Sequence, residues 1–375
     1  MPKYKFSDFA YNINQKKMPE LGDEEMYIGL EHLDSGSLKV RRWGSDVPIT
    51  GEKLVMRKGD ILFGRRNTYL RRAAIAPHDG IFSAHGMIFR PNTQLMDPDY
   101  FPFFISSDYF MNEAIRISVG SLSPTVNWKT LKDLEFEIPD LDTQRRKAQI
   151  LSTANRLKEA YEVLLVQTDE LVKSQFIELF GTHENTNYPI KTLEELCEPI
   201  KDGTHQTPTY TDDKENGFLF LSSKDVTSKY VDWDHPMYIP PELHEQLYKR
   251  IAPRKGDILL AKNGTTGIAA IVDRDVVFDI YVSLALLRFL PGCNVKYMWA
   301  AINMPETKKQ FDSRLKGIGV PNLHLGEIKK ARIIVPPIAA QDQFAEFLEQ
   351  SDKSKFEIKK SIQNIAELMK SVIQD

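Results

Sequence analysis

The chain has 375 residues, 42% hydrophobic and 27% charged, which is typical of a globular protein with two or three domains. Its formal net charge of −3 argues against a protein that coats nucleic acid through charge alone, since such proteins are usually strongly basic. It contains no long uninterrupted apolar run and no apolar segment near the N-terminus, so we expect no membrane span, no secretory signal and a cytoplasmic location. Cys197 and Cys293 are isolated, which argues for free thiols and against a zinc site.

An internal repeat is the most informative feature. Residues 57–62, Arg-Lys-Gly-Asp-Ile-Leu, recur letter for letter at residues 254–259, an offset of 197. The same offset, without a gap, relates three further pairs: Pro124 and Pro321, Gln144 and Gln341, Leu151 and Leu348. A repeat this long indicates two copies of a whole domain rather than the short units of a solenoid.

The first copy, residues 1–141, is predicted to be an α/β domain. Short apolar runs bounded by Gly, Asp and Ser predict strands, and a helix is expected over residues 100–117. The expected strands cover residues 25–30, 59–62, 73–76, 87–89 and 134–139. Short strands with few helices favour a mixed or antiparallel sheet.

One segment of this copy is strongly basic. Residues 53–72 contain seven Lys or Arg side chains and one acid, Asp60. Cations interleaved with an aromatic and small polar side chains can contact phosphates, and Arg can donate two hydrogen bonds to guanine. The candidate DNA-binding residues here are Arg65, Arg66, Asn67, Tyr69, Arg71 and Arg72. The alternative is a solvated hairpin whose charges only favour solubility.

A long helix is predicted over residues 142–181, followed by a polar linker at 182–189. Leu157, Leu164 and Leu171 recur every seven residues, with Ala154, Tyr161 and Thr168 between them. Such spacing is typical of a coiled coil. Gly181 stands where a glycine commonly ends a helix.

The second copy, residues 190–339, repeats this pattern with different polar loops. Strands are expected at 217–221, 256–259, 268–272, 284–287 and 331–337, a helix at 297–315, and a turn at 317–319. Loops 201–208 and 262–267 are rich in hydrogen-bonding side chains. The candidate DNA-binding residues here are Lys201, Thr204, His205, Lys262, Asn263, Thr265 and Thr266. The alternative for the first loop is a structured turn in which Asp202 and Thr204 cap local backbone.

A second long helix is predicted over residues 340–375. Ile358, Ile365 and Val372 follow the heptad spacing, with Ile362 beside them. We expect the two helices, each roughly 50 Å long, to pair antiparallel as a coiled coil. The residues expected in this pair or against partners are Leu157, Tyr161, Leu164, Leu171, Ile358, Ile362, Ile365 and Val372. The alternative is two independent surface helices.

The usual signatures of catalysis are missing from the sequence. We find no Gly-rich dinucleotide or phosphate loop, no His-Glu-x-x-His zinc motif and no Gly-x-Ser-x-Gly nucleophile turn. The Asn-Pro-Pro-aromatic signature of amino-methyltransferases is also absent, and Pro336-Pro337 looks like a strand end. The sequence therefore favours a binding protein without catalytic or metal-binding residues.

Over its whole length the chain resembles the specificity subunit of a type I restriction-modification system. The resemblance lies in the order of several motifs combined with the repeat. These motifs are the Gly-Asp-Ile-Leu elements at 59–62 and 256–259, Asp202 to His205, Gly264 to Gly267, the segments 124–139 and 321–336, and the helix starts at 144–146 and 341–343.

The resemblance implies a subunit without catalytic activity or bound cofactor. Each target-recognition domain would read one half of a bipartite, asymmetric target in double-stranded DNA, and the helices would set the spacer. Two modification subunits, which use S-adenosylmethionine to methylate adenine N6, would dock on the chain, and restriction subunits would add ATP- and Mg-dependent activity.

Two other interpretations remain open from the sequence. One is the specificity subunit of a related system whose partner fuses methyltransferase and endonuclease in one polypeptide. The other, more distant, is a coiled-coil adaptor whose two domains bind proteins.

Overall fold

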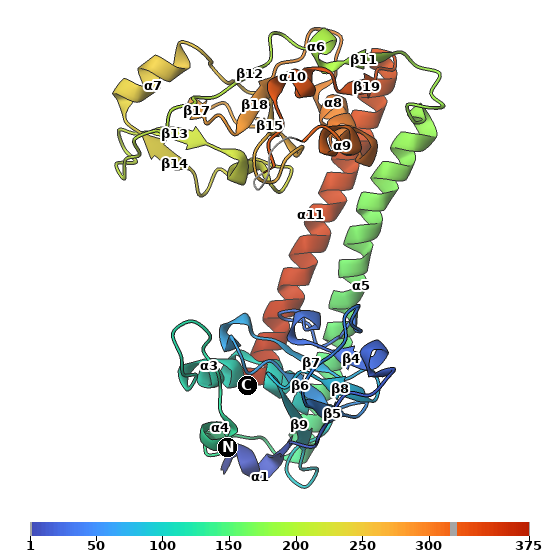
Figure 1. Cartoon of the computed structure of the whole chain (residues 1–375), viewed down its shortest axis with the longest axis vertical. Helices are drawn as coiled ribbons and strands as arrows, with labels where there is room; N and C mark the ends of the chain where they lie inside the picture. Colours follow the sequence, from blue (N-terminus) through green and yellow to red (C-terminus); the bar gives the residue numbers. More distant parts are fainter. Residues whose placement is uncertain (1, 316–320, 375) are drawn as a thin grey trace. The chain divides into compact units, whose positions relative to one another are not determined.

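The computed structural model describes residues 2–315 and 321–374; the turn expected at 317–319 lies outside them. The chain divides into two compact units, Met1–Leu164 with Ile358–Asp375, and Leu165–Glu357 (Figure 1). Each unit therefore contains one recognition domain and parts of both long helices. The sequence predicted the helices at 142–181 and 340–375 as separate segments, whereas each of these compact units includes one end of each helix.

The first unit contains two four-stranded sheets and one strand pair. One sheet is antiparallel, in the order β2-β9-β6-β7; the other is mixed, in the order β3-β5-β8-β4, with β4 and β8 parallel. Strand β1 pairs with β10. The strands are β1 (Lys3–Lys5), β2 (Ala10–Ile13), β3 (Lys16–Lys17), β4 (Tyr27–Ile28), β5 (Lys53–Met56), β6 (Ile61–Phe63), β7 (Ala73–Ile75), β8 (Gly80–Phe82), β9 (Met87–Pro91) and β10 (Glu135–Glu137).

Short helices cover the core of this unit. The helix expected at 100–117 is two helices, because Ser107 has an extended backbone and its hydroxyl accepts a hydrogen bond from Phe110 N (3.2 Å), which caps the second. The core is rich in phenylalanine: Phe6 makes ring contacts with Phe9, Phe89, Phe110 and Phe136. The helices are α1 (Phe6–Phe9), α2 (Phe101–Ser106), α3 (Asp108–Arg116) and α4 (Trp128–Leu131), with 3-10 turns η1 (Asp23–Met26), η2 (Leu30–His32) and η3 (Thr68–Leu70).

The second unit repeats this plan. One antiparallel sheet has the order β12-β18-β15-β16, a mixed sheet has the order β14-β13-β17, and β11 pairs with β19. The strands are β11 (Ile190–Thr192), β12 (Lys201–Asp202), β13 (Phe218–Leu221), β14 (Met237–Ile239), β15 (Ile258–Ala261), β16 (Ala269–Ile271), β17 (Phe278–Ile280), β18 (Leu284–Leu287) and β19 (Arg332–Ile334).

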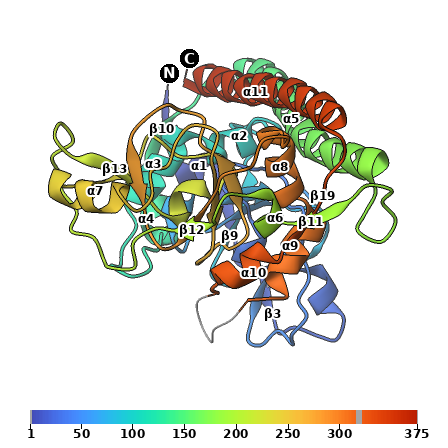
Figure 2. The same cartoon turned by 90° about the horizontal axis from the view of Figure 1, so that it is seen from above.

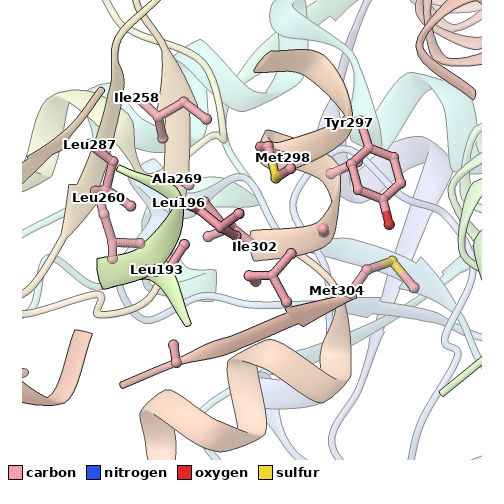
Figure 3. Close-up of a cluster of buried hydrophobic side chains, with 14 of the residues drawn as sticks. Leu193, Leu196, Ile258, Leu260, Ala269, Leu287, Tyr297, Met298, Ile302 and Met304 are labelled. Carbon is pink, nitrogen blue, oxygen red and sulfur yellow. The ribbon is translucent and has the colours of Figure 1, made fainter. Parts of the chain in front are cut away.

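Helices of the second unit pack on the first of these sheets. Figure 3 shows Ile258 and Leu260 of β15 beside Leu196, Tyr297 and Ile302 from helices, all buried in one core cluster. The helix expected at 297–315 breaks before Pro305, which starts a new helix. The helices are α6 (Leu193–Leu196), α7 (Pro241–Tyr248), α8 (Val295–Ile302), α9 (Pro305–Asp312) and α10 (Leu325–Lys329), with the 3-10 turn η4 (Ser223–Val226).

The repeated Lys-Gly-Asp-Ile-Leu element forms the same turn and strand in both units. Gly59 and Gly256 have φ of 90° and 92°, a conformation that favours glycine. The buried Asp60 carboxylate accepts two hydrogen bonds from Arg90 (2.5 and 2.9 Å). Asp257 does the same with Arg288 (2.7 and 2.7 Å). The repeat therefore encodes a two-bond Asp–Arg clamp, which holds the central strand to its neighbour.

Strand pairing corrects the expectation of an offset without gaps. Ile61 lies opposite Ile75 and Phe89 in the first unit, whereas the equivalent Ile258 lies opposite Ile271 and Leu287. The offset is therefore 196 at the first partner and 198 at the second. The loop before β7 is one residue longer in the first copy, and the connection that follows is two residues longer in the second. Further along the chain, another change in loop length restores the offset of 197 residues. The individual insertions were therefore not visible when the two copies were compared by sequence alone.

Two long helices follow the domains, α5 (Leu141–Phe180) and α11 (Ile338–Gln374). Each begins with a buried glutamine. The Gln144 side chain accepts a hydrogen bond from Asp97 N and donates to Leu95 O and Pro139 O, each 2.8 Å. Gln341 accepts from Asn294 N (2.9 Å) and donates to Pro336 O (2.8 Å). Gly181, with φ of 76°, follows the end of α5 as expected.

Within each unit, the parts of α5 and α11 lie side by side and run antiparallel (Figures 1 and 2). In the second unit, Phe344 early in α11 contacts Phe176 and Phe180 late in α5, and Lys355 pairs with Asp169 (3.1 Å). In the first unit, Met369, Val372 and Ile373 pack on the core cluster that includes Ala148 and Leu151. Antiparallel contacts are thus present in each unit taken by itself.

The buried face of α5 differs from the one expected. Leu157, Leu164 and Leu171 are 47%, 43% and 54% exposed, so they do not form the seam. The buried positions are instead Leu151, Ala154, Phe176 and Phe180, with Ile358 on α11; Tyr161, Ile362, Ile365 and Val372 are half-buried. A heptad row of leucines predicts an apolar face but does not say what covers it.

Within the described ranges, none of the helices combines the length and apolar character needed to cross a bilayer. Over the same residues, no group of three or more His, Cys, Asp or Glu side chains is arranged to hold a metal ion. Cys197 and Cys293 carry free thiols, and burial raises the pKa of both.

Candidate nucleic-acid interface

The basic loop of the first unit follows β6 directly and covers residues 64–72. Its two sides are held by main-chain hydrogen bonds to the segment after Pro124: Asn67 N donates to Pro124 O (2.8 Å), and Val126 N donates to Arg65 O (3.0 Å). Asn67 and Arg71 have positive φ, 54° and 49°, on either side of η3. The loop is therefore a defined turn with a fixed base.

The cations of this loop have different surroundings. Arg66 is exposed and its guanidinium donates to Ser123 Oγ (3.3 Å), while Tyr69 is 56% exposed at the tip. Arg65 is half-buried and donates to Ala84 O (3.4 Å). These three side chains could reach a ligand, and Asn67, which is half-buried like Arg65, stays a candidate.

Arg71 and Arg72 are held by the protein itself. Arg71 pairs with Asp108 (2.7 Å) and also donates to the Asn112 side chain. Arg72 donates to Leu30 O (3.0 Å) and Arg66 O (3.3 Å), and burial lowers its pKa. Both guanidiniums thus hold the loop on the domain, which supports a structural role, and their assignment as DNA contacts stays a prediction.

In the second unit, loop 262–267 occupies the equivalent place after β15. Gly264 N donates to Pro321 O (3.3 Å) and Leu323 N donates to Lys262 O (2.7 Å), the same two bonds as in the first unit. Asn263 forms a bridge with Asn322 and is half-buried. Thr265 is exposed, whereas Thr266 is buried, so Thr265 is the candidate that can reach a ligand.

The other candidate loop begins at β12 and depends on Gly203. A Cβ at this position would lie 1.9 Å from Ile280 O, so the close approach of the two chains requires glycine. Thr204 pairs with Tyr281 through its backbone and is buried, which fits a structural role for its side chain. His205 and Lys201 are exposed; the Lys201 ammonium donates to Arg250 O (3.3 Å).

Asp202 brings the two loops of the second unit together. Its carboxylate accepts from the buried Lys262 ammonium (2.6 Å) and lies 3.3 Å from His205 Nε2 and 3.4 Å from Arg250. Burial opposes the charge of Asp202, but hydrogen bonds and charge from Lys262 and then His205 outweigh it, so the pKa of Asp202 is lowered. Lys262 is thus held as the counter-ion of Asp202, and its assignment as a DNA contact stays a prediction, while His205 lies at the surface.

A second buried pair lies near this cluster. His244 Nδ1 is 2.6 Å from Asp279 Oδ2, and the His244 ring stacks on Phe218 with centroids 3.7 Å apart. Burial raises the pKa of Asp279 despite the hydrogen bond and charge of His244. The pair joins α7 to β17, and Asp279 lines a small cavity together with Gly203 and Thr204.

Several of these residues were not recognised in the sequence. Arg250, His244 and Asp279 gave no signal, because each acts through a partner that is distant in sequence. Pro124 and Pro321 did give one, since they were matched by the repeat, but their role in holding the loops was not evident without the strand pairing.

Comparison with known proteins agrees with this architecture. The family model described as the type I restriction modification DNA specificity domain matches residues 5–162 and 185–368. The MjaVIII specificity subunit of a type I restriction enzyme from Methanocaldococcus jannaschii is 22% identical, over 97% of this chain and 91% of that protein. The EcoBI specificity subunit from Escherichia coli is 25% identical, over 63% of this chain and 55% of that protein.

Solved structures share the fold along the whole chain. A structure described as the basis of complex assembly and conformational transition of the type I restriction-modification system has a TM-score of 0.59 and 16% identity, covering 100% of this chain and 96% of that one. The S subunit from M. genitalium has a TM-score of 0.55 and 13% identity, covering 99% and 94%.

Two copies of one domain, each presenting a loop held at the same two points but carrying different side chains, define a duplicated recognition protein. The family model matches both copies, and the chain therefore belongs to the type I restriction-modification DNA specificity family.

Proposed function

We propose that this chain reads DNA for a type I restriction-modification complex, with each domain contacting one half of a bipartite, asymmetric target. The observation that carries the proposal is the repeated loop: the same backbone hydrogen bonds hold residues 64–72 and 262–267, yet the exposed side chains differ. A constant support with different surface chemistry is what two readers of two sequences require.

The first domain offers Arg65, Arg66 and Tyr69, and the second offers Lys201, His205, Asn263 and Thr265. Arg suits guanine or phosphate, and amide or hydroxyl groups can pair with several base edges. The different chemistry supports two unlike half-sites and hence an asymmetric target. The helices α5 and α11 would set the length of the spacer between them.

The chain would contribute no catalytic group and no cofactor of its own. Methylation of adenine N6 would depend on modification subunits carrying S-adenosylmethionine, and cleavage on restriction subunits using ATP and Mg. The complex would act in the cytoplasm, where chromosomal and incoming DNA meet.

Docking of the modification subunits on α5 is supported by its exposed apolar side chains. Ile150 and Leu157, seven residues apart, are 49% and 47% exposed, and Leu171 continues the spacing. Heptad-spaced apolar side chains on a helix commonly pack against another helix. The proposed partner surface is therefore a helix face next to the one that packs on α11.

Replacing Arg65 and Arg66 together by Ala tests the assignment of the first domain. The complex with its modification subunit should bind its target roughly tenfold or more weakly, with a salt dependence reduced by about two phosphate contacts if both reach the backbone. Base preference should relax in one half-site only. Fluorescence anisotropy at several salt concentrations and selection from a randomised DNA library would measure both.

Lys129→Ala provides the matched control, because Lys129 is an exposed cation of the same unit outside the loop. It should leave affinity and both half-sites unchanged. If the Arg65/Arg66 double variant and Lys129→Ala change DNA affinity equally, or if neither changes it, the loop is not part of the DNA interface.

A further inference from the structure

An open groove lies within the first unit, between the recognition domain and the first turns of α5. It has a volume of about 1280 Å³. Its walls include Trp43, Ile75, Phe103, Ala148, Ser152 and Arg156. Trp43 is 46% exposed and makes an edge contact with His78 (5.0 Å between ring centroids). Exposed aromatic side chains of this kind are common at protein interfaces.

The repeat places an equivalent site in the second unit. Ile75 forms a parallel bridge with Lys39, and its counterpart Ile271 forms the same bridge with Tyr230. Asp352 on α11 corresponds to Asn155 on α5 at the 197-residue offset. The site around Ile271, Tyr230 and Asp352 has a volume of only about 200 Å³.

Two aromatic side chains fill the second site. Tyr230 donates a hydrogen bond to Asp352 (3.2 Å), and its ring lies 6.0 Å from that of Trp299. Trp299 Nε1 donates to Ala269 O (2.8 Å). The second domain is therefore joined to its helix by its own aromatic residues.

The first unit has no aromatic side chain at these positions. Lys39 stands where Tyr230 would be, and Pro102 where Trp299 would be. Its loop reaches α5 further along, through Arg41 with Glu162 (3.2 Å) and Gly36 O with Lys158 (3.4 Å). This attachment leaves the space beside Ser152 and Asn155 open.

Charge also differs between the two sites. The walls of the first groove carry five cations and three acids: Lys39, Arg41, Lys58, Arg145, Arg156, Asp97, Asp99 and Glu159. The walls of the second site carry two cations and three acids: Lys229, Lys296, Asp273, Glu349 and Asp352. In the first groove Arg41 is paired with Glu162 and Arg145 with Asp97, which leaves Lys39, Lys58 and Arg156 against Asp99 and Glu159. We therefore expect a ligand for this groove to be acidic, and the second site shows that aromatic rings fit this place in the fold.

We infer that the groove takes an acidic, aromatic-bearing segment of the modification subunit, which fills the place that Tyr230 and Trp299 fill in the second unit. The inference rests on the proposed function for the identity of the partner. It makes the two domains unequal in docking: one is closed by its own side chains, and the other is completed by the partner.

Photo-crosslinking in the assembled complex with DNA tests the occupant. A benzophenone amino acid replacing Ser152 should crosslink to a modification-subunit peptide containing Asp or Glu and an aromatic residue, as identified by mass spectrometry. The same group replacing Arg146, an exposed α5 residue outside the groove, is the control and should not give that peptide. A crosslink to DNA, a crosslink only within this chain, or none at Ser152 would overturn the inference.

Charge reversal provides an independent measurement. Arg156→Glu should weaken binding of the purified modification subunit at least tenfold, whereas Arg146→Glu should change it less than twofold. Equal affinities for the two variants would overturn the inference. Sequence-specific DNA binding by the wild-type complex is measured in parallel: if it persists, only the groove assignment fails, and if it is absent, the proposed function fails.

Discussion

At the scale of single residues, buried charge pairs hold the recognition surface in place. Asp60 with Arg90 and Asp257 with Arg288 fix the central strands, and Asp202 with Lys262 joins the two loops of the second unit. A buried ion is costly without its partner, so each pair makes the loops depend on residues distant in sequence. Such partners determine which candidate cations remain available to a ligand.

Asp202→Asn should destabilise the second unit by about 3 kcal/mol at neutral pH, because it leaves the buried Lys262 without a counter-charge. The pKa of Asp202 is lowered in the folded state, so its stabilising effect is full above the unfolded value of 3.8 and is lost as pH falls through the folded value. The free energy of unfolding, measured in urea, should thus differ between wild type and variant by a constant amount from about pH 5 to about pH 7. This difference should become smaller below about pH 4.

Asp212→Asn is the matched control, since Asp212 is exposed in the same unit. It should change the free energy of unfolding by less than about 0.5 kcal/mol. A similarly small effect for Asp202→Asn would show that the ion pair with Lys262 contributes little to stability.

At the scale of elements, the helix starts repeat more faithfully than the loops. Gln144 and Gln341 are both almost completely buried, and each joins its helix to the strand before it and the loop beneath the domain. The length differences between the two copies lie in the connections between earlier strands, and the offset is a constant 197 from Pro139 and Pro336 into the helix starts. The long helices are thus fixed to the domains at their first turns, independently of loop length.

Many of the secondary-structure elements could be predicted from the sequence, because strands, helix starts and glycine turns depend on local sequence patterns. Leu157 shows the limit: heptad spacing identified an apolar face of α5, but the buried positions are Leu151, Ala154 and Phe176. Arg71 and Arg72 show the same limit for the candidate site, because their carboxylate and carbonyl partners come from segments distant in sequence. Contacts between distant residues were the part that the pattern could not supply.

Gln144→Ala should lower the free energy of unfolding by about 1–3 kcal/mol, because two main-chain carbonyls and one N–H lose their buried partner. Gln341→Ala should have a similar effect, as the equivalent residue. Gln167→Ala, exposed on α5, should have almost none. Urea unfolding of the full chain measures all three, and an effect of Gln144→Ala no larger than that of Gln167→Ala would contradict the clamp.

At the scale of the whole molecule, duplication lets one polypeptide carry two readers that share supports and differ in surface. The two units are equal in sheet order around β6 and β15, in the Asp–Arg clamp and in the loop anchors. They are unequal in exposed polar groups and in the site beside the helix, open in one and filled by Tyr230 and Trp299 in the other. Under the proposed function, inequality of this kind would give the chain a direction along an asymmetric target.

Inserting one heptad into each helix, near residues 165 and 357, should lengthen the preferred DNA spacer. Seven residues add about 10 Å of helix while keeping the apolar faces aligned, which corresponds to roughly three base pairs. Methylation-site sequencing in a host expressing the variant with its modification subunit would report the new spacing. As the control, seven residues inserted in the linker 182–189 should leave the preferred DNA spacer unchanged. If the helix insertions also leave the spacer unchanged, the helices do not set its length.

The anchors at Pro124 and Pro321 have a consequence for evolution and engineering. They act through main-chain amides and carbonyls, so exposed side chains such as Arg66, Tyr69 and Thr265 can change without loss of the anchoring bonds. Under the proposed function, substitutions at these exposed positions would alter the DNA sequence that is read, while the main-chain anchors and the fold of each domain stay in place.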